Sequence, residues 1–385
     1  MSTPKPPHFI VQRNDLVREL MLAVGAVERK TTIPVLANVK IEASDFGRLV
    51  LTARDPELGM VFRCDAQVKV PGETTLPAKR LLDYARLLPD GPVEIKVGDT
   101  HWATITAGRS KARLAGMGSE SFPELPAGPE PVCKLPLAVF VGMVHRTIYA
   151  ICMEESRFTL NGAIFETGLD GLKMVATDGH RLTVAEAPGE AKKAEKYLIP
   201  KKALVELVRL AGTAGVDAAV EFAVDENHMF FAVGERLLVA RRMAGSFPDY
   251  ARVIPKSFKG TATVSRQSLK DALNRVRNFA DDRSRAVKIT IGDGQIGVFA
   301  SEVESGESEE SATAETNVSV VIGFNADYLL DFLGSTETEK VTLSFGDGNS
   351  ALQMAPVGEP GGHLCIIMPL RLQPSADNYK RSDTK

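Results

Sequence analysis

The chain has 385 residues, 44% of them hydrophobic and 25% charged, with a formal net charge of −3, which is typical of a globular protein of two to four domains. No apolar run reaches the roughly 18 residues that a membrane-spanning helix needs, and the first residues contain no apolar export signal. The four cysteines stand alone, without a C-x-x-C pair, which favours buried thiols in a reducing compartment such as the cytoplasm.

The first third of the chain predicts two helices and about eight short strands. Asn14 or Asp15 is the expected cap of the first helix, whose apolar stripe begins at Leu16. The second helix is predicted to start at Pro77. Proline lacks a backbone N–H, and in the first helical turn the N–H groups have no partner within the helix. The predicted strand pairs are residues 39–42 with 48–53 and residues 93–97 with 103–106, with a turn for the second pair at residues 90–91.

The same order of elements is predicted twice more. The opening helix covers residues 137–151 in the second unit and is capped by Ser268 in the third, and the second helices start at Pro200 and Asn325. The strand pairs are 163–167 with 172–177, 219–223 with 229–233, 287–291 with 295–300, and 341–345 with 351–354. Each unit is therefore an α+β fold.

The three units are near copies in sequence as well. Residues 76–89 read LPAKRLLDYARLLP, residues 199–210 read IPKKALVELVRL, and residues 323–333 read GFNADYLLDFL. The helix starts are 123 and 125 residues apart, and SFPEL at residues 121–125 recurs as SFPDY 125 residues later. A period near 124 residues is too long for a solenoid repeat and fits one domain.

Proline-rich polar segments divide the chain between these copies. We predict a first domain over residues 1–128, a second over 129–255 and a third over 256–372. Residues 373–385 have almost no large apolar side chain, so we expect them to form a free, disordered tail.

Four segments carry a family resemblance. LNGAIFE at residues 160–166, VATDGHRL at 175–182, SFPDYARVIP at 246–255 and MPLRL at 368–372 closely resemble the bacterial beta sliding clamps, and the likeness runs over residues 8–372. The resemblance implies three clamp domains in an arc, and two chains joined head to tail in a six-domain ring with helices around a central hole. The function it implies is a non-catalytic processivity subunit of the replicative DNA polymerase, which encircles duplex DNA.

The resemblance also implies a groove between the second and third domains that takes short linear peptides. The implied partners are a clamp loader, DNA polymerases, ligase and mismatch-repair proteins. An apolar slot with a glycine that admits backbone and with cations at its mouth suits such a ligand. The residues carried over to the groove are Leu160, Thr177, Gly179, His180, Arg181, Leu182, Pro248, Arg252, Val253, Tyr328, Ile366, Met368, Leu370 and Arg371.

Charge at the two ends of the chain favours head-to-tail pairing. Arg109, Lys111 and Arg113 alternate along a predicted strand of the first unit, so they share one face, and glutamates crowd residues 302–315 of the third unit. The family places its dimer interface in these regions. Its expected members here are Arg109, Lys111, Leu114, Asn278, Phe279, Glu302 and Glu304, with Asn278 replacing an aliphatic residue.

For DNA, the expected contacts are to phosphates and independent of base sequence. The candidate cations are Arg29, Lys30, Lys79, Arg80, Arg146, Arg157, Lys201, Lys202 and Arg275.

Two alternatives stay open at this point. Asp178 and His180 invite a hydrolase or metal enzyme, although the sequence has no nucleophile-elbow motif, no second histidine at metal-ligand spacing and no P-loop. The other alternative is a specialised clamp paralogue. No catalytic residue, metal ligand or cofactor is predicted.

Overall fold

The computed structural model describes residues 5–27, 32–302, 306–347, 349–359 and 362–371. Within that part of the chain, one order of helices and strands recurs three times. The first repeat contains β1 (His8–Gln12), α1 (Arg13–Ala26), β2 (Asn38–Ser44), β3 (Arg48–Arg54), β4 (Leu58–Asp65), β5 (Gln67–Val70), β6 (Gly72–Pro77), α2 (Ala78–Leu87), β7 (Pro92–Val97), β8 (Trp102–Ala107) and β9 (Ser110–Ala115).

The other two repeats follow the same plan without a counterpart of β5. The second contains β10 (Cys133–Pro136), α3 (Leu137–His145), β11 (Gly162–Thr167), β12 (Leu172–Thr177), β13 (Arg181–Ala187), β14 (Glu195–Pro200), α4 (Lys201–Ala211), β15 (Ala219–Val224), β16 (His228–Val233) and β17 (Arg236–Arg241). The third contains β18 (Gly260–Ser265), α5 (Arg266–Val276), β19 (Ala286–Gly292), β20 (Gln295–Glu302), β21 (Gly306–Thr316), β22 (Val320–Asn325), α6 (Ala326–Ser335), β23 (Lys340–Phe345), β24 (Leu352–Pro356) and β25 (His363–Ile367). The predicted helices and strand pairs are all present.

The predicted helix ends need correction. The residue before α1 is Gln12, with no side-chain capping bond, so neither Asn14 nor Asp15 caps that helix. The cap of α5 is Ser265, whose hydroxyl accepts from the backbone N–H of Ser268, so Ser268 is the donor rather than the cap. Ser265 is better placed than Ser268, because a capping residue must precede the helix and accept a hydrogen bond from an N–H group of its first turn.

Helix α3 is also shorter than the predicted 137–151, because it ends at His145. The hydroxyl of Thr147 donates to the carbonyl of Met143 at 2.9 Å, which satisfies an end-of-helix carbonyl that a continuing helix would use. A single 3-10 turn, Ile148–Ala150, follows. The turn predicted at residues 90–91 precedes β7, and residues 98–101 join β7 to β8 instead.

Strand pairing continues across both boundaries between repeats. β17, the last strand of the second repeat, pairs antiparallel with β4 of the first, and β25, the last strand of the third, pairs with β13 of the second. The sheets that result have eight and twelve strands, and a five-stranded sheet with the order β5-β1-β7-β8-β9 completes the first repeat. The backbone therefore joins the repeats by the same pairing at each boundary.

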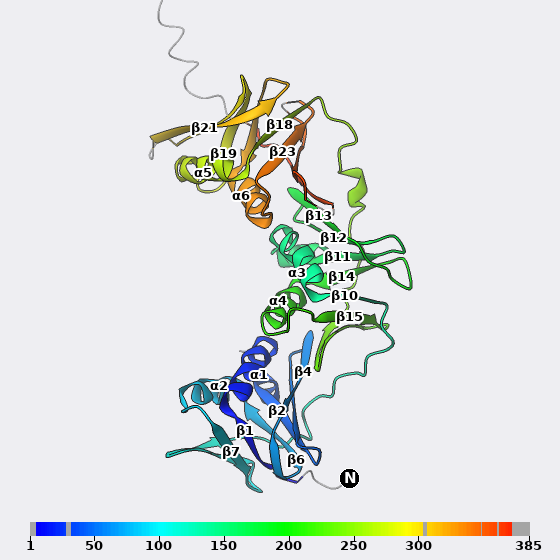
Figure 1. Cartoon of the computed structure of the whole chain (residues 1–385), viewed down its shortest axis with the longest axis vertical. Coiled ribbons are helices and arrows are strands. Elements are labelled where there is room, and N and C mark those ends of the chain that lie inside the picture. Colours follow the sequence, from blue (N-terminus) through cyan, green and yellow to red (C-terminus); the bar gives the residue numbers. More distant parts are fainter. Residues whose placement is uncertain (1–4, 28–31, 303–305, 348, 360–361, 372–385) are drawn as a thin grey trace, which may run out of the picture.

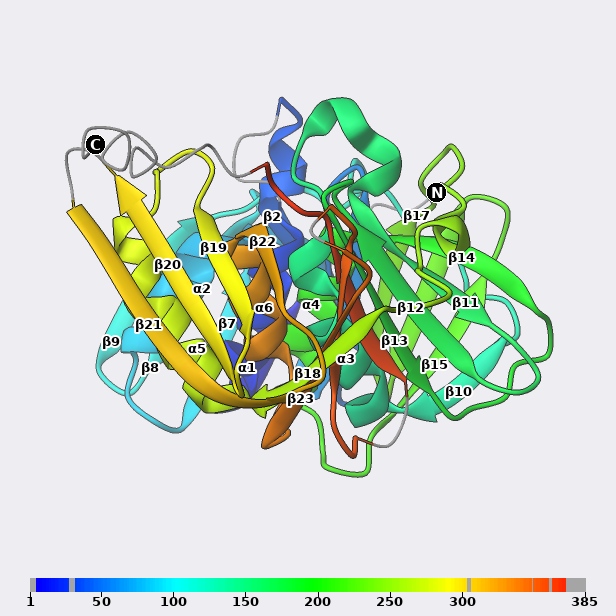
Figure 2. The same ribbon diagram turned by 90° about the horizontal axis from the view of Figure 1, so that it is seen from above.

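The three repeats form an arc. In Figure 1 the six helices lie on its concave side and the sheets form its convex side. The helices bury their apolar stripes against the sheets, as Leu16 and Leu20 of α1 and Leu269 and Leu273 of α5 show. Viewed along the long axis, β19, β20 and β21 lie side by side at one margin of the third repeat (Figure 2). Among the described residues, no helix is long and apolar enough to cross a membrane.

His363 is a buried titratable group at the boundary between the second and third repeats. It lies on β25 with its ring 5.0 Å from that of Phe332, and neither ring nitrogen has a hydrogen-bond partner among the described residues. Burial, with a smaller contribution from the positive charge of Arg146, lowers the pKa of His363 from 6.5 to about 4. The folded protein thus keeps this imidazole neutral where the unfolded chain protonates it.

We predict that His363 makes the protein sensitive to mild acid. Its contribution to stability is complete above pH 6.5 and is lost as the pH falls towards 4, because only the unfolded state binds the proton in that window. Urea unfolding at pH 7 and pH 4.5 should show that His363→Gln removes about 2 kcal/mol of the loss seen in the parent protein. Equal losses in parent and variant would contradict this assignment.

Candidate functional site

The turn between β12 and β13 forms one side of the predicted groove. The Asp178 carboxylate accepts the backbone N–H groups of His180 and Arg181 at 2.9 and 3.0 Å. Gly179 has a φ of +90°, a conformation that residues with a side chain rarely adopt. The Thr177 hydroxyl accepts from the Gly179 N–H at 3.1 Å and donates to the Arg181 carbonyl at 2.6 Å. These bonds hold the turn rigidly at the convex sheet surface.

The other side of the groove comes from the third repeat. The backbone N–H of Met368 donates to the His180 carbonyl at 2.9 Å, directly after β25 ends, and Leu182 pairs with Ile366. Leu182 and Ile366 are buried in an apolar cluster with Ile164, Val175 and Val184. The β13–β25 pairing therefore brings residues nearly 190 positions apart in sequence to one place.

The segment that joins the second and third repeats covers this cluster. Phe247, Tyr250 and Ile254 pack against it, which sequence reasoning did not assign to the site although SFPDY repeats. Met368 and Val253 remain 45% and 47% exposed, and Pro248, His180 and Arg252 are also exposed. These five residues offer a rim of apolar and polar side chains around a buried aliphatic floor.

The remaining predicted groove residues lie at the margins. Leu160 is buried at the end of a 3-10 helix, Glu155–Leu160. The N–H of Leu370 donates to the carbonyl of Gly323 on β22 at 2.8 Å, and Arg371 is exposed beside it. Tyr328 is half-buried on α6, with the Arg181 guanidinium 4.4 Å from its ring centre.

Arg181, one of the predicted groove residues, is held by partners within the chain. Only 9% of its side chain is exposed. The guanidinium donates to Asp178 at 3.1 Å, to Asp331 of α6 at 2.5 Å and to the carbonyl of Tyr149 at 2.6 Å. The nearby carboxylates outweigh burial and raise its pKa. Arg181 therefore links the second repeat to the third.

Both ends of the arc present a strand with an unpaired edge. Within the described residues, β9 pairs only with β8, apart from an isolated bridge after its end, and residues 306–313 of β21 pair only with β20. Lys111 and Arg113 are exposed on β9, and Glu307 and Glu309 are exposed on β21. The predicted separation of basic and acidic residues between the two ends is therefore present.

The other predicted interface residues lie near these strands. Arg109 is exposed in the turn before β9, and Leu114 is half-buried on the strand. Phe279, also half-buried, lies close to the start of β21, and the Asn278 amide donates to the Asn274 carbonyl at 2.9 Å. Glu302 ends β20, whereas Glu304 lies outside the described residues.

Comparison with known proteins matches all three repeats to one family. The models for the N-terminal, central and C-terminal domains of the DNA polymerase III beta subunit match residues 7–126, 134–249 and 251–371. The chain belongs to the beta sliding clamp family. It is therefore a DNA sliding clamp of the polymerase III holoenzyme, a non-catalytic processivity factor.

Individual relatives cover nearly the whole chain. The beta sliding clamps of Pseudomonas putida and Escherichia coli K12 are 33% and 31% identical to it, and the alignments cover 95% and 94% of this chain and all of each relative. Among solved structures, the sliding clamps of Pseudomonas aeruginosa and Bartonella birtlesii, each bound to griselimycin, superpose with TM-scores of 0.89 and 0.90. Both are 31% identical, and the matches cover 96% of this chain and all of each clamp.

A sliding clamp is non-catalytic, and the contacts of Asp178 and His180 are not those of a catalytic dyad. The Asp178 carboxylate is taken up by two backbone N–H groups and by Arg181, and the contact with His180 runs through the histidine backbone. No group of histidine, cysteine or acidic side chains in the described part of the chain is arranged to hold a metal ion.

The cations predicted to contact DNA have different surroundings in the structure. Arg29 and Lys30 lie outside the described residues, so the structure does not place them. Lys79 and Arg80 are exposed on α2 and have no ion-pair partner among the described residues. The remaining candidates have partners within the chain: Arg146 pairs with Glu359, Arg157 with Glu154, Lys202 with Asp55 and Arg275 with Glu310, and the Lys201 ammonium lies 3.0 Å from the Met153 sulfur.

We predict that Arg181→Ala destabilises the clamp by about 3 kcal/mol, because it leaves Asp178, Asp331 and the Tyr149 carbonyl without their shared donor. Urea unfolding measures the change. The matched control is Arg252→Ala on the same groove, which should shift stability by less than about 0.5 kcal/mol. The Arg252 side chain is 85% exposed and, among the described residues, forms an ion pair only with Asp249. Equal effects of the two substitutions would refute the role given to Arg181.

Proposed function

We propose that two copies of this chain close head to tail into a ring around duplex DNA, and that the ring slides while holding other proteins to the template. The observation that carries the proposal is the strand left over at each end of the arc. β9 is the counterpart of β17 and β25 in the repeat order, and β21 is the counterpart of β4 and β13.

The two junctions inside the chain join a strand of the first kind to a strand of the second kind, as β17 with β4 and β25 with β13. One strand of each kind, β9 and β21, is left with an open edge. Strand edges with unpaired N–H and C=O groups favour pairing with another chain. Because the repeats are alike, a third junction of the same geometry, between β9 of one copy and β21 of its partner, closes two arcs into a ring.

Charge and apolar contact support this third junction. The basic side chains of β9, Lys111 and Arg113, face the acidic side chains of β21, Glu307 and Glu309, while Leu114 packs towards Phe279 and Asn278 of the partner. Surface ion pairs contribute only about 0–1 kcal/mol each. We therefore assign the tightness of the dimer to the backbone pairing and the apolar contact, and the choice of partner edge to the charges.

The concave helical side faces the DNA. A groove of about 1000 Å³ runs between α1, α2 and α4 on that side. Its lining includes Lys79 and Arg86, the ion-paired Arg18 and Arg209, and the acidic Asp83 and Glu206. Exposed cations on helix surfaces contact phosphates without reading bases, and such contacts exchange quickly, which allows sliding. We assign the first DNA contacts to Lys79 and Arg80.

The groove between the second and third repeats receives short peptides from the partners. We propose that a clamp loader, replicative and repair polymerases, ligase and mismatch-repair proteins dock there, each raising its local concentration at the template. The buried aliphatic floor of Leu182 and Ile366 takes an apolar side chain, and exposed Met368 adapts to its shape. The place of action is the cytoplasm, where the DNA is.

We predict that a charge exchange separates ring closure from folding. Lys111→Glu with Arg113→Glu in one chain, and Glu307→Lys with Glu309→Lys in another, each juxtapose like charges at both junctions of a homodimer. Each variant alone should dissociate at least about tenfold more readily than the parent. A one-to-one mixture restores opposite charges at both junctions, so its sedimentation mass should return to twice 41.6 kDa. Failure of the mixture to associate better than either variant would contradict the pairing.

A topological test addresses the DNA contacts. Clamp loaded on nicked circular DNA should stay bound at 0.5 M salt and leave when the circle is cut, because enclosure rather than affinity retains it.

In direct binding to linear DNA, Lys79→Ala with Arg80→Ala should lower the slope of log affinity against log salt by about two. Arg63→Ala on the convex sheet is the matched control and should leave that slope unchanged. Equal slopes for all three proteins would exclude α2 from the DNA contact.

A further inference from the structure

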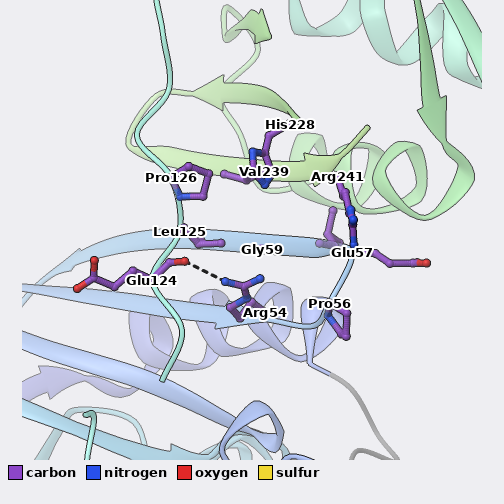
Figure 3. Close-up of a pocket in the computed structure, with 11 residues that line it drawn as sticks. Arg54, Pro56, Glu57, Gly59, Glu124, Leu125, Pro126, His228, Val239 and Arg241 are labelled. Carbon is purple, nitrogen blue, oxygen red and sulfur yellow. Dashed lines mark hydrogen bonds between the residues drawn. The ribbon is translucent and has the colours of Figure 1, made fainter. Parts of the chain in front are cut away.

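The first junction inside the chain is the pairing of β17 with β4, which joins the first repeat to the second. A cavity of about 390 Å³ lies on the convex side between the first and second repeats. Figure 3 shows its wall. The wall includes Arg54 at the end of β3, Glu57 in the turn that follows, Gly59 near the start of β4, Leu125 from the connecting segment, and Val239 and Arg241 from β17.

This cavity has the same backbone frame as the peptide groove between the second and third repeats. Asp55 begins the turn before β4 as Asp178 begins the turn before β13. Each carboxylate accepts the backbone N–H groups of the residues two and three positions later, at 2.8 and 2.7 Å for Asp55 and at 2.9 and 3.0 Å for Asp178. The two turns are therefore built by the same bonds.

The strands that meet at the two junctions match residue for residue. The N–H of Arg241 donates to the Glu57 carbonyl at 2.8 Å, as the N–H of Met368 donates to the His180 carbonyl at 2.9 Å. In the ladder next to these bonds, Gly59 pairs with Val239, where the other junction pairs Leu182 with Ile366. Arg241 thus occupies the position of Met368, and Val239 the position of Ile366.

The floors of the two sites differ in one respect. A Cβ atom added to Gly59 would lie 2.3 Å from a methyl carbon of Leu125, so the side chain of Leu125 fills the space that a leucine would take at that strand position. Leu125 packs there against the buried cluster of Ala223, Phe230 and Val239. The site therefore has an aliphatic floor, supplied in part by the connecting segment.

The walls carry two arginines without a carboxylate partner among the described residues. The Arg54 guanidinium donates to the backbone carbonyl of Glu124 at 2.9 Å, and neither Arg54 nor Arg241 forms an ion pair there. In Figure 3 the carboxylates of Glu57 and Glu124 extend away from the space between the two arginines. Two guanidinium groups beside an aliphatic floor are complementary to a carboxylate next to an apolar side chain.

We propose that this junction pocket binds a short peptide segment that presents an aliphatic side chain next to a carboxylate. The aliphatic side chain rests on Val239 and Leu125, and the carboxylate takes donors from Arg54 and Arg241. A volume of about 390 Å³ suits two or three side chains, within the usual range of ligand sites. The proposal rests in part on the proposed groove, whose backbone frame it shares. It would let one chain hold two partner peptides, one at each internal junction.

The test is methyl NMR of the full-length chain labelled at leucine and valine, titrated with the capped hexapeptide Ala-Ala-Leu-Asp-Leu-Ala. Signals of Leu125 and Val239 report the junction pocket, and those of Leu182 and Val253 report the groove. Arg54→Ala with Arg241→Ala should weaken binding at the junction pocket about tenfold and leave the groove unchanged. Arg63→Ala, on the same strand face as Gly59 but outside the pocket, should change neither. Thermal unfolding of each variant confirms its fold.

The outcomes separate this proposal from the proposed function. Shifts of Leu125 and Val239 that saturate and weaken in the double variant support the junction pocket. Shifts confined to Leu182 and Val253 overturn it while the groove stands, and an absence of shifts at all four residues counts against both sites. Junction shifts that persist unchanged in the double variant overturn recognition by the arginines. Shifts of Leu125 on removal of residues 372–385, without peptide, would make the chain's own end the occupant and overturn a partner peptide.

Discussion

The whole molecule depends on one kind of strand pairing. The last strand of each later repeat pairs with the third strand after the opening helix of the repeat before it. This pairing joins β17 to β4 and β25 to β13, so two sheets cross repeat boundaries without a break. The same kind of pairing therefore joins successive repeats at both boundaries, and the chain forms an arc (Figure 1). The same rule leaves β9 and β21 open, which makes a closed ring of two chains the consistent way to satisfy their backbone groups.

The junctions also form the two sites proposed to bind peptides. Each brings a turn capped by an aspartate next to the end of a strand from the following repeat, and each is crossed by the segment that connects the two repeats. The side chains then differ. Arg181 links Asp178 and Asp331 at the second junction, while Lys202 of α4 pairs with buried Asp55 at the first. One backbone frame thus supports two sites of different chemistry.

The sequence predicted the repeat and the order of elements, because apolar periodicity and the recurrence of SFPEL as SFPDY are local signals. The groove residues came from the family resemblance of segments such as TDGHRL. The sequence did not predict the role of Arg181, because the contacts with Asp331 and Tyr149 join parts of the chain 150 and 32 residues away. The ion pairs of Arg146 with Glu359 and of Lys202 with Asp55 also could not be predicted, because the partners are far apart in the sequence. The cap of α5 lies three residues before the predicted one, since both Ser265 and Ser268 fit the pattern and only backbone geometry selects Ser265.

Hydrogen exchange of the unmodified chain tests the central claim most directly. Over a dilution series that carries the protein from dimer to monomer, the backbone amides of β9 and of residues 306–313 should lose protection together, at the concentration where the mass halves. Amides of β4 and β17, which pair inside the chain, should keep theirs throughout. A dimer in which the β9 and β21 amides exchange as fast as in the monomer would contradict closure by strand pairing.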